Sequence, residues 1–239
     1  MRLTAAILLL AAVAFADERT VTVANAPSGP AMQEMATVLR TVIDIPKVTV
    51  NPASFILEGT PAQLDAAEWV IHQLDKPPGG KPANAAVREF RLPPETRGPV
   101  IRIYYLSDPG IKTMQEELTI LRLVIDVQKV FQYSPLQALV YRDMDSDPED
   151  VEWLLHALEA HVTSVPHRLL VGHPRDLVRV FALPPETTAR QVLDLVAKLR
   201  MPPVSTMKVF ARNVPPAIVI RGTSEQLEAA EAIVTKGNQ

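Results

Sequence analysis

The residues of this sequence that could carry chemistry are first its five histidines. His72 and His156 each follow a tryptophan by three residues, which places the imidazole about one helical turn beyond the indole. His161, His167 and His173 recur every six residues, a spacing that does not match a zinc site. We expect the first pair to pack on the indoles and the other three to lie on a solvated connector. A ligand-binding or pH-sensing role for the pair, and a metal site on the connector, are the alternatives.

A dense run of carboxylates comes second. It consists of Asp143, Asp145, Asp147, Glu149 and Asp150. Alternating aspartates are typical of a calcium loop, but the glycine at its sixth position and its terminal glutamate are missing, so calcium is the weaker interpretation. Acidic residues at the start of a helix favour the positive end of the helix dipole, which explains the last three without a metal.

No known catalytic motif is present: there is no nucleophile elbow, HExxH, phosphate-binding loop or dinucleotide fingerprint. The chain also contains no cysteine, which excludes disulfides and thiolate chemistry. We therefore predict a protein that is not an enzyme and that uses no cofactor and no metal. A Ser-His-Asp enzyme or a small-ligand binder with a site in a groove between modules is the alternative.

The elements that would position these residues are organised around a stretch that occurs twice. Residues 59–68 return as residues 222–231 at a constant offset, and such internal similarity sets the unit of folding. In each copy a threonine, Thr60 or Thr223, precedes a glutamine by three residues, which predicts a capping box at the start of a helix. Apolar residues then follow at helical spacing.

Three tandem modules of the α+β class follow from this pattern, each with the order β-α-β-β-α. We place module one at residues 17–77, a Pro/Gly linker at 78–86, module two at 87–162, a connector at 163–175 and module three at 176–239. The junction at residues 42–48 is echoed at residues 124–130. Module two has one more strand, which we place at residues 101–106. We expect a first strand at residues 20–23 and a short strand within residues 167–172.

Each module is expected to carry two helices on one face of a small sheet, because neither helix can bury its apolar stripe alone. The opposite sheet face and the sheet edges would then be free for a partner. We therefore predict contacts through two strands, with these residues as the candidates: Val48, Thr49, Val50, Lys208, Val209 and Phe210.

Targeting and charge narrow the class of partner. Arg2, an apolar run over residues 3–15 and the small-residue site Ala14-Phe15-Ala16 are typical of a signal peptide of residues 1–16. A retained anchor is the alternative, although the run is short for a bilayer span. The formal net charge is −3 and aromatic residues make up 5% of the chain, which argues against a nucleic-acid partner. We expect a periplasmic protein that does not span a membrane after cleavage.

Residues 48–50, 55–64 and 74–77 resemble the short N-terminal repeats of bacterial secretins, the outer-membrane rings of type II and type III secretion and type IV pilus systems. Residues 218–223 repeat the pattern, and module two matches it more loosely. The resemblance implies a KH-like fold that packs side by side in a periplasmic ring. It does not extend to the barrel-forming region of that family, so it implies no pore.

The resemblance implies a function in protein–protein contact, as an accessory or scaffold of an envelope secretion or pilus assembly. The expected partner is a secretin or a pilus component, and self-association is the further possibility. The glycine loop by which KH domains clamp nucleic acid is missing between the helices.

Overall fold

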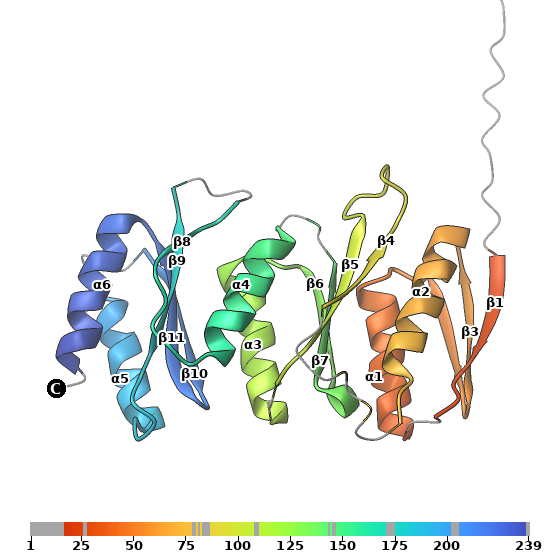
Figure 1. Ribbon diagram of the computed structural model, residues 1–239, viewed down its shortest axis with the longest axis horizontal. Coiled ribbons are helices and arrows are strands. Elements are labelled where there is room, and N and C mark those ends of the chain that lie inside the picture. Colours follow the sequence, from red (N-terminus) through yellow and green to blue (C-terminus); the bar gives the residue numbers. More distant parts are fainter. Residues whose placement is uncertain are drawn as a thin grey trace, which may run out of the picture.

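A computed structural model shows three small sheets and three helical pairs, stacked in alternating layers along the long axis of the molecule (Figure 1). The structure describes residues 17–25, 28–77, 80, 82, 87–107, 110–142, 144, 147–170, 175–201 and 206–237. The predicted signal peptide and most of the predicted linker lie outside these residues. The predicted α+β class, with two helices and a small antiparallel sheet in each unit, is confirmed.

Sheet 1 has three antiparallel strands in the order β1-β3-β2, so β1 and β2 are its edges. Its strands are β1 (Asp17–Thr22), β2 (Lys47–Asn51) and β3 (Ser54–Gly59). The helices of this unit are α1 (Gly29–Thr41) and α2 (Pro61–Leu74).

Sheet 2 has four antiparallel strands in the order β4-β5-β7-β6. They are β4 (Arg88–Arg91), β5 (Val100–Tyr105), β6 (Lys129–Tyr133) and β7 (Ala138–Arg142), with a short 3-10 helix, η1 (Ser134–Leu136), between the last two. The helices are α3 (Ile111–Val124) and α4 (Pro148–Glu159).

Sheet 3 repeats this arrangement in the order β8-β9-β11-β10. It contains β8 (His167–Arg168), β9 (Leu177–Ala182), β10 (Lys208–Asn213) and β11 (Pro216–Gly222). The helices α5 (Ala189–Leu199) and α6 (Ser224–Gly237) cover one face of this sheet. The strand expected within residues 167–172 is β8, and residues 171–172 lie outside the described part.

The additional strand of the second unit is β4, so our placement of it at residues 101–106 is wrong. Strand β5 pairs with β7 as β1 pairs with β3 and β9 pairs with β11, whereas β4 is an edge strand. The error arose from a motif shared by residues 90–96 and 181–187. In the second unit that motif begins in the last residues of the edge strand β4, and in the third it begins in the last residues of the inner strand β9.

Local capping starts several helices as the sequence predicts. The hydroxyl of Thr60 accepts from the Gln63 backbone N–H while the Gln63 side chain returns to the Thr60 N–H, and Thr223 forms the same box with Gln226. A third box, Thr188 with Gln191, starts α5. Asp147 caps α4 through the Glu149 N–H. The predicted cap at residues 108–109 lies outside the described part, and α3 begins after Gly110.

Each inner helical pair packs against two sheets at once. One apolar cluster joins α1 and α2 to sheet 1 and to residues of sheet 2 such as Ile103, Tyr105 and Val140. A second cluster joins α3 and α4 to the other face of sheet 2 and to Val180 and Val219 of sheet 3. Our expectation that the second face of every sheet stays free is therefore wrong for sheets 2 and 3. The expectation treated each module as a unit that folds alone. A module of this size buries too little apolar surface by itself, so neighbouring modules share their helices and sheets.

The burial of the central strands differs between sheets that helices cover on one face and sheets that helices cover on both faces. Strand β3 alternates between buried and half-buried residues, because helices cover only one face of sheet 1. Strands β7 and β11 are buried at every residue, because helices cover both faces of sheets 2 and 3. Within the described ranges, no helix is long and apolar enough to cross a membrane.

Candidate interaction surface

The turns that leave α1 and α3 each place an aspartate in the left-handed backbone conformation. Asp44 has φ 65° and Asp126 has φ 60°, a region that asparagine and aspartate tolerate better than most residues. Both lie in the junction motif that the sequence repeats, three residues before a lysine. Their carboxylates point across to the next sheet of the stack.

Each of these carboxylates meets one lysine and one arginine of the next sheet. Asp44 pairs with Lys129 of β6, and Arg142 of β7 approaches it to 3.2 Å through Nη1. Asp126 pairs with Lys208 of β10 at 2.9 Å and with Arg221 of β11 at 2.7 Å. Both sets hold the same strand positions, because the lysine and the arginine face each other in the register of both sheets. We call the two sets the first and second interlayer clusters.

The arginines of the clusters are buried and fully engaged. Arg142 also donates to the carbonyl oxygens of Gly98 at 2.7 Å and Arg97 at 2.6 Å. Arg221 also donates to Asp176 at 3.0 Å and to the Val124 carbonyl. Burial opposes ionisation of Asp126, but hydrogen bonds from Arg221 and Lys208 outweigh it and hold its pKa below the usual value.

A second repeated contact ties each helix to the end of the neighbouring edge strand. Glu34 of α1 accepts from the backbone N–H of Ser134 at 2.7 Å and from its hydroxyl at 2.8 Å. Glu116 of α3 accepts from the backbone N–H of Asn213 at 2.9 Å and from its side-chain amide. The two contacts occupy the same position after β6 and at the end of β10, so both junctions are built from the same parts.

The edge strands are also partly blocked by arginine side chains. Arg40 donates to the Val48 carbonyl of β2 at 2.7 Å, and Arg122 donates to the Val130 carbonyl of β6 at 2.8 Å. Arg200, which follows α5, donates to the Val209 carbonyl of β10 at 3.2 Å. A strand edge whose groups are already bonded accepts a foreign strand less readily. The edges are therefore less open than the sequence suggested.

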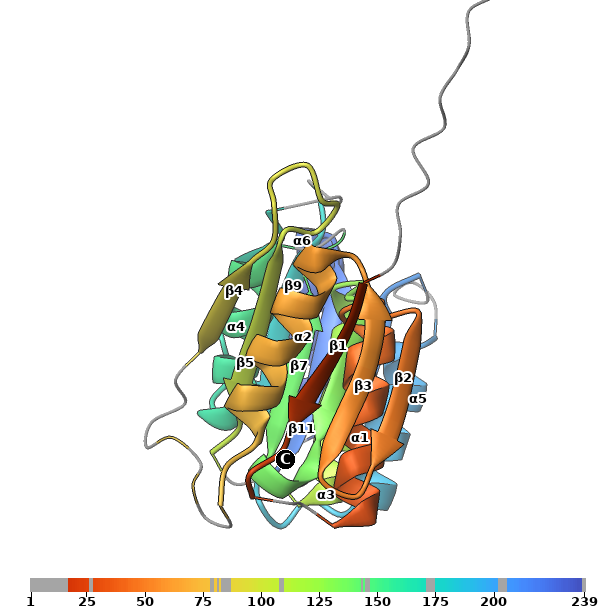
Figure 2. The same cartoon turned by 90° about the vertical axis from the view of Figure 1, so that its right-hand side faces the viewer.

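Edge strands and helices alternate along one side of the stack, in the order β2, α1, β6, α3, β10, α5. We call this surface the side wall. Figure 2, seen along the stack, shows β2, α1 and α5 on one side and β4 and α4 on the other. The first two helices of the side wall, α1 and α3, carry the same side-chain contact. The Thr37 hydroxyl donates to the Gln33 carbonyl, and the Thr119 hydroxyl donates to the Gln115 carbonyl.

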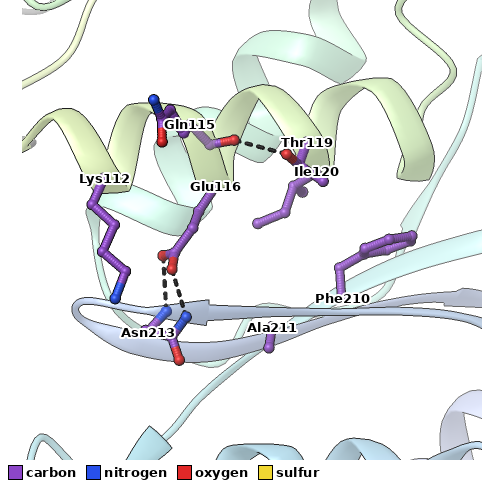
Figure 3. A pocket seen from close by; sticks show the side chains of 8 residues that line it. All are labelled: Lys112, Gln115, Glu116, Thr119, Ile120, Phe210, Ala211 and Asn213. Atoms are coloured by element: carbon purple, nitrogen blue, oxygen red, sulfur yellow. Dashed lines mark hydrogen bonds between the residues drawn. The ribbon is translucent and has the colours of Figure 1, made fainter.

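A groove of about 300 Å³ opens in the side wall between α3 and β10 (Figure 3). Figure 3 shows the Glu116 carboxylate turned to Asn213, with Ile120 and Phe210 further along the groove. The residues that line it are Lys112, Gln115, Glu116, Thr119, Ile120, Phe210, Ala211 and Asn213. The groove is thus formed by two units and exists only where they stack.

The six predicted contact residues lie on edge strands, as expected, but most of their side chains are already occupied. Val48 and Val50 pack in the first apolar cluster, and only Thr49 faces the outer side of sheet 1. On β10, Lys208 pairs with Asp126, Val209 is buried beneath α5 and α6, and Phe210 packs toward α3. Contact of a partner with these strands stays a prediction.

The outer face of sheet 1 differs from the covered faces of the other two sheets. Its middle row is Thr20, Ile56 and Thr49, where the paired strands of sheets 2 and 3 present only apolar side chains. Those rows are Ile103, Val140 and Phe131 in sheet 2, and Val180, Val219 and Phe210 in sheet 3. At the arginine position of the interlayer clusters, sheet 1 has Glu58, which pairs with Lys47. This polar face is suited to water, as in the terminal unit of a repeat protein.

Two of the histidines have specific partners. The Nδ1 atom of His156 lies 3.1 Å from the Tyr104 hydroxyl, which also donates to Glu159. His167 stacks on the Trp153 indole, and its Nε2 atom lies 2.7 Å from Asp150 Oδ1. His156 thus contacts a tyrosine instead of the tryptophan that we expected, and His167 is tied to α4. His173 lies outside the described residues.

The carboxylate run serves the helix and the connector. Asp147 caps α4, and the buried Asp150 binds His167 and the Leu170 N–H. Asp143 and Asp145 lie outside the described residues. Within the described part, no three His, Asp or Glu side chains come together in a way that could hold a metal ion.

Sequence reasoning recognised the repeated junction motif and missed its role. The signal was the aspartate three residues before a lysine in both copies, with an arginine closing the next hairpin. The sequence shows these residues but does not show that they belong to successive layers.

Comparison with known proteins gives no family for this chain. No family model matches it, and no curated protein matches it. Solved structures do match, among them these three. The ETEC pilotin–secretin AspS–GspD complex is 14% identical over 95% of this chain and 38% of that chain, with a TM-score of 0.23. Aeromonas hydrophila ExeD is 19% identical over 93% of this chain and 41% of that chain, with a TM-score of 0.22.

The third is the Salmonella SPI-1 type III secretion injectisome basal body with InvG, PrgH and PrgK. It is 19% identical over 69% of this chain and 32% of that chain, with a TM-score of 0.22. The chain thus spans well under half the length of the chains that it matches. Similarity at these TM-scores does not establish a shared function.

Proposed function

We propose that the chain is an exported, non-enzymatic scaffold that binds other proteins of a bacterial envelope secretion or pilus assembly. The observation that carries this proposal is the side wall. It runs through all three units and is built from repeated parts, so one partner could be contacted at several successive units. Residues 48–50, 55–64 and 74–77 resemble secretin repeats, and this resemblance supports a secretion or pilus system as the assembly in question.

The interlayer clusters support a scaffold because they hold the units in one fixed arrangement. Two separate cation–carboxylate sets, each with a buried arginine, set the angle between neighbouring layers. A partner that spans two units would therefore meet a preorganised surface, which lowers the entropic cost of binding.

A small-ligand binder is the second candidate, and the groove between α3 and β10 favours it. Its one lining carboxylate, Glu116, is engaged by Asn213. A ligand in the groove would therefore meet two charged groups, the Lys112 ammonium and the Glu116 carboxylate, which stays charged because Asn213 is neutral.

The test is site-specific photo-cross-linking in the envelope of the native host. A photoreactive residue at Gln33 or Gln115, both exposed on the side wall, should give adducts with secretion or pilus proteins. The same residue at Glu228, exposed on α6, is the matched control and should give none. Equal adducts from all three positions, or none from the wall, would contradict the proposal.

A further inference from the structure

We propose that the outer edge of β1 binds an extended, basic segment of a partner protein. This edge of sheet 1 lies opposite β2 and next to α2 (Figure 2). The inference rests on the proposed scaffold function and names the place and chemistry of one contact. Three observations support it: the equivalent edge is covered in the other two units, an arginine beside β1 has an unused donor, and carboxylates outnumber cations on both sides of the edge.

The strands equivalent to β1 are each covered by the segment that precedes them in the chain. In the second unit β4 pairs along β5, and in the third β8 pairs along β9. Ser164 extends the second cover, because its N–H donates to the Val180 carbonyl at 2.9 Å and its hydroxyl accepts from the Val180 N–H at 3.0 Å. Within the described residues of the first unit, no strand pairs with the outer edge of β1.

The backbone groups of this edge are open over three alternate residues. Val23 donates to the Ala53 carbonyl on the β3 side at 2.9 Å, and residues two apart along a strand direct their backbone groups to the same side. The intervening residues of β1 therefore direct their N–H and C=O away from β3: Glu18, Thr20 and Thr22. The open stretch ends at Ala24, whose N–H donates to Asp75 at 2.6 Å. A short antiparallel segment can bond to it, as in β-strand addition.

The arginine with the unused donor is Arg19. It holds the register position that Arg102 holds in β5 and Arg179 holds in β9. In those two units the arginine Nε donates to the covering segment, to the Glu89 carboxylate at 2.8 Å and to the Ser164 carbonyl at 2.9 Å. Arg19 donates only through Nη1 among the described residues. A segment bound along β1 would supply an acceptor for its Nε.

The helix side of the edge has a surplus of negative charge. Arg19 Nη1 donates to Asp65 at 2.8 Å and to Glu68 at 2.9 Å, so two carboxylates share one cation. Their side chains are 59% and 41% exposed, which leaves both accessible to a ligand. Lys76 lies at the far end of α2, where it donates to the His72 carbonyl. A basic side chain is therefore favoured here, and a neutral oxygen suffices for Arg19 Nε.

The outer side of the edge has the same surplus. The register places the exposed Glu18 beside Glu58, and the nearby Lys47 pairs with Glu58. Two carboxylates again share one cation. Because both sides of the edge favour a cation, the segment that fits this place carries basic residues on both of its faces.

The test uses the synthetic peptide Thr-Lys-Val-Gln-Lys-Thr, with a fluorophore at its N-terminus and an amide at its C-terminus, and the protein of residues 17–239. Antiparallel pairing with the glutamine opposite Arg19 places one lysine on each face of sheet 1. Fluorescence anisotropy measures binding, and amide shifts of isotope-labelled protein locate it. We expect saturable binding with the largest shifts at the amides of Glu18, Thr20 and Thr22. Glutamate in place of both lysines should weaken binding about tenfold, as expected for two exposed charge pairs.

The charge is tested on the protein by Asp65→Asn. It should weaken binding of the lysine peptide about two- to fivefold, as expected for one exposed ion pair. Glu228→Gln is the matched control, because Glu228 holds the same place in the repeated sequence and lies on α6. It should leave binding unchanged. Equal effects of the two variants would contradict the role of charge at this edge.

The decisive change is proline in place of the peptide's valine, which lies opposite Thr20 and donates to its carbonyl. This change leaves the protein intact and should abolish binding, because proline has no N–H. Thr20→Pro removes the outward N–H on the protein side, where an edge strand tolerates proline, and should abolish binding as well. Thr20→Val keeps the N–H and is the matched control, so it should bind as the wild type does.

Equal binding of the proline peptide, or amide shifts confined to other strands, would overturn the inference. Sedimentation provides a second check. A dimer that closes the β1 edge against the peptide would also overturn it, because a second copy would then be the occupant. Side-wall cross-links that persist without peptide binding would show that the proposed scaffold function stands alone. Peptide binding at β1 without those cross-links would contradict the side wall and leave the β1 site in place.

Discussion

At the scale of single residues, the most unusual group is Glu117 of α3. Its side chain is 1% exposed and faces Arg212 of β10, whose Nη2 atom lies 2.9 Å from Oε1 without forming a hydrogen bond. The pKa of Glu117 is raised to about 7, because burial, with a smaller contribution from the carboxylates of Glu159 and Glu116, outweighs the lowering by Arg212. A carboxyl group at this position is therefore protonated in the folded state at a pH where it is ionised in the unfolded chain.

The consequence is a pH dependence of stability with a definite sign. Between about pH 4.5 and 7, the folded state keeps the Glu117 proton and the unfolded state has lost it. This group therefore makes the free energy of unfolding fall as the pH rises through that window. The slope from one such group is at most about 1.4 kcal/mol per pH unit. Urea unfolding at pH 5, 6 and 7 should show a steeper fall for the wild type than for Glu117→Gln.

The matched control for this experiment is Glu228→Gln, at an exposed position on α6. It should keep the slope of the wild type, because the change is at the surface and leaves the buried Glu117 and its surroundings intact. An identical slope in Glu117→Gln and the wild type would contradict the assignment.

At the scale of elements, the interlayer clusters decide how one unit sits on the next. Each turn after an inner helix supplies the carboxylate, and each following hairpin supplies the lysine and the arginine. In both turns the aspartate has the left-handed conformation, and its carboxylate contacts the next hairpin. The same turn chemistry at Asp44 and Asp126 therefore gives the same stacking twice.

We predict that Asp126→Asn lowers the free energy of unfolding by about 1–2 kcal/mol, since it removes charge-assisted bonds to Arg221 and Lys208. The expected loss is small because the Asp126 side chain is 35% exposed and solvent screens its charge. Asp44→Asn should cost less, because the Asp44 side chain is 44% exposed and its contact with Arg142 is longer, 3.2 Å against 2.7 Å for Asp126 and Arg221. Urea unfolding measures both losses.

High salt is the control for this prediction, because screening weakens partly exposed ion pairs. The difference between Asp126→Asn and the wild type should shrink between low salt and 1 M salt, where the Debye length is about 3 Å. A loss that is independent of salt would point to a packing defect instead.

At the scale of the whole molecule, the chain is a stack whose inner layers share their apolar cores. Sheet 2 gives one face to the helices of the first unit and the other face to its own helices. From the sequence, we place module one at residues 17–77 and a linker after it, which is typical of a unit that folds by itself. In the structure that piece would lose one of the two sheets that cover α1, so its stability depends on its neighbour.

We predict that residues 17–239 unfold in a single thermal transition, and that residues 87–239 alone melt at a lower temperature. Removal of the first unit uncovers the face of sheet 2 that carries Phe131, Ile103 and Val140, and this apolar area no longer contributes to folding. Calorimetry measures the transitions, and binding of a hydrophobic dye reports the uncovered face. An unchanged melting temperature without dye binding would show that the units are independent.

The sequence by itself determined the features that depend on neighbouring residues. Capping boxes, helix stripes, short strands and the repeated aspartate turn all follow from interactions within a few positions of the chain. Thr60 with Gln63 is the clearest case, since its hydrogen bonds span three residues. The α+β class followed from the same local patterns.

Only the tertiary structure decided which surfaces meet. The continuous apolar runs of β7 and β11 signal strands buried on both faces, but they do not identify the elements that cover them. Asp126 and Arg221 are far apart in the chain, and their contact exists because α3 and α4 fill the space between sheets 2 and 3. The groove depends on the same stacking, because its two walls belong to different units. Local periodicity reports how much of a strand is buried, whereas the choice of neighbour depends on the shape and charge of whole layers.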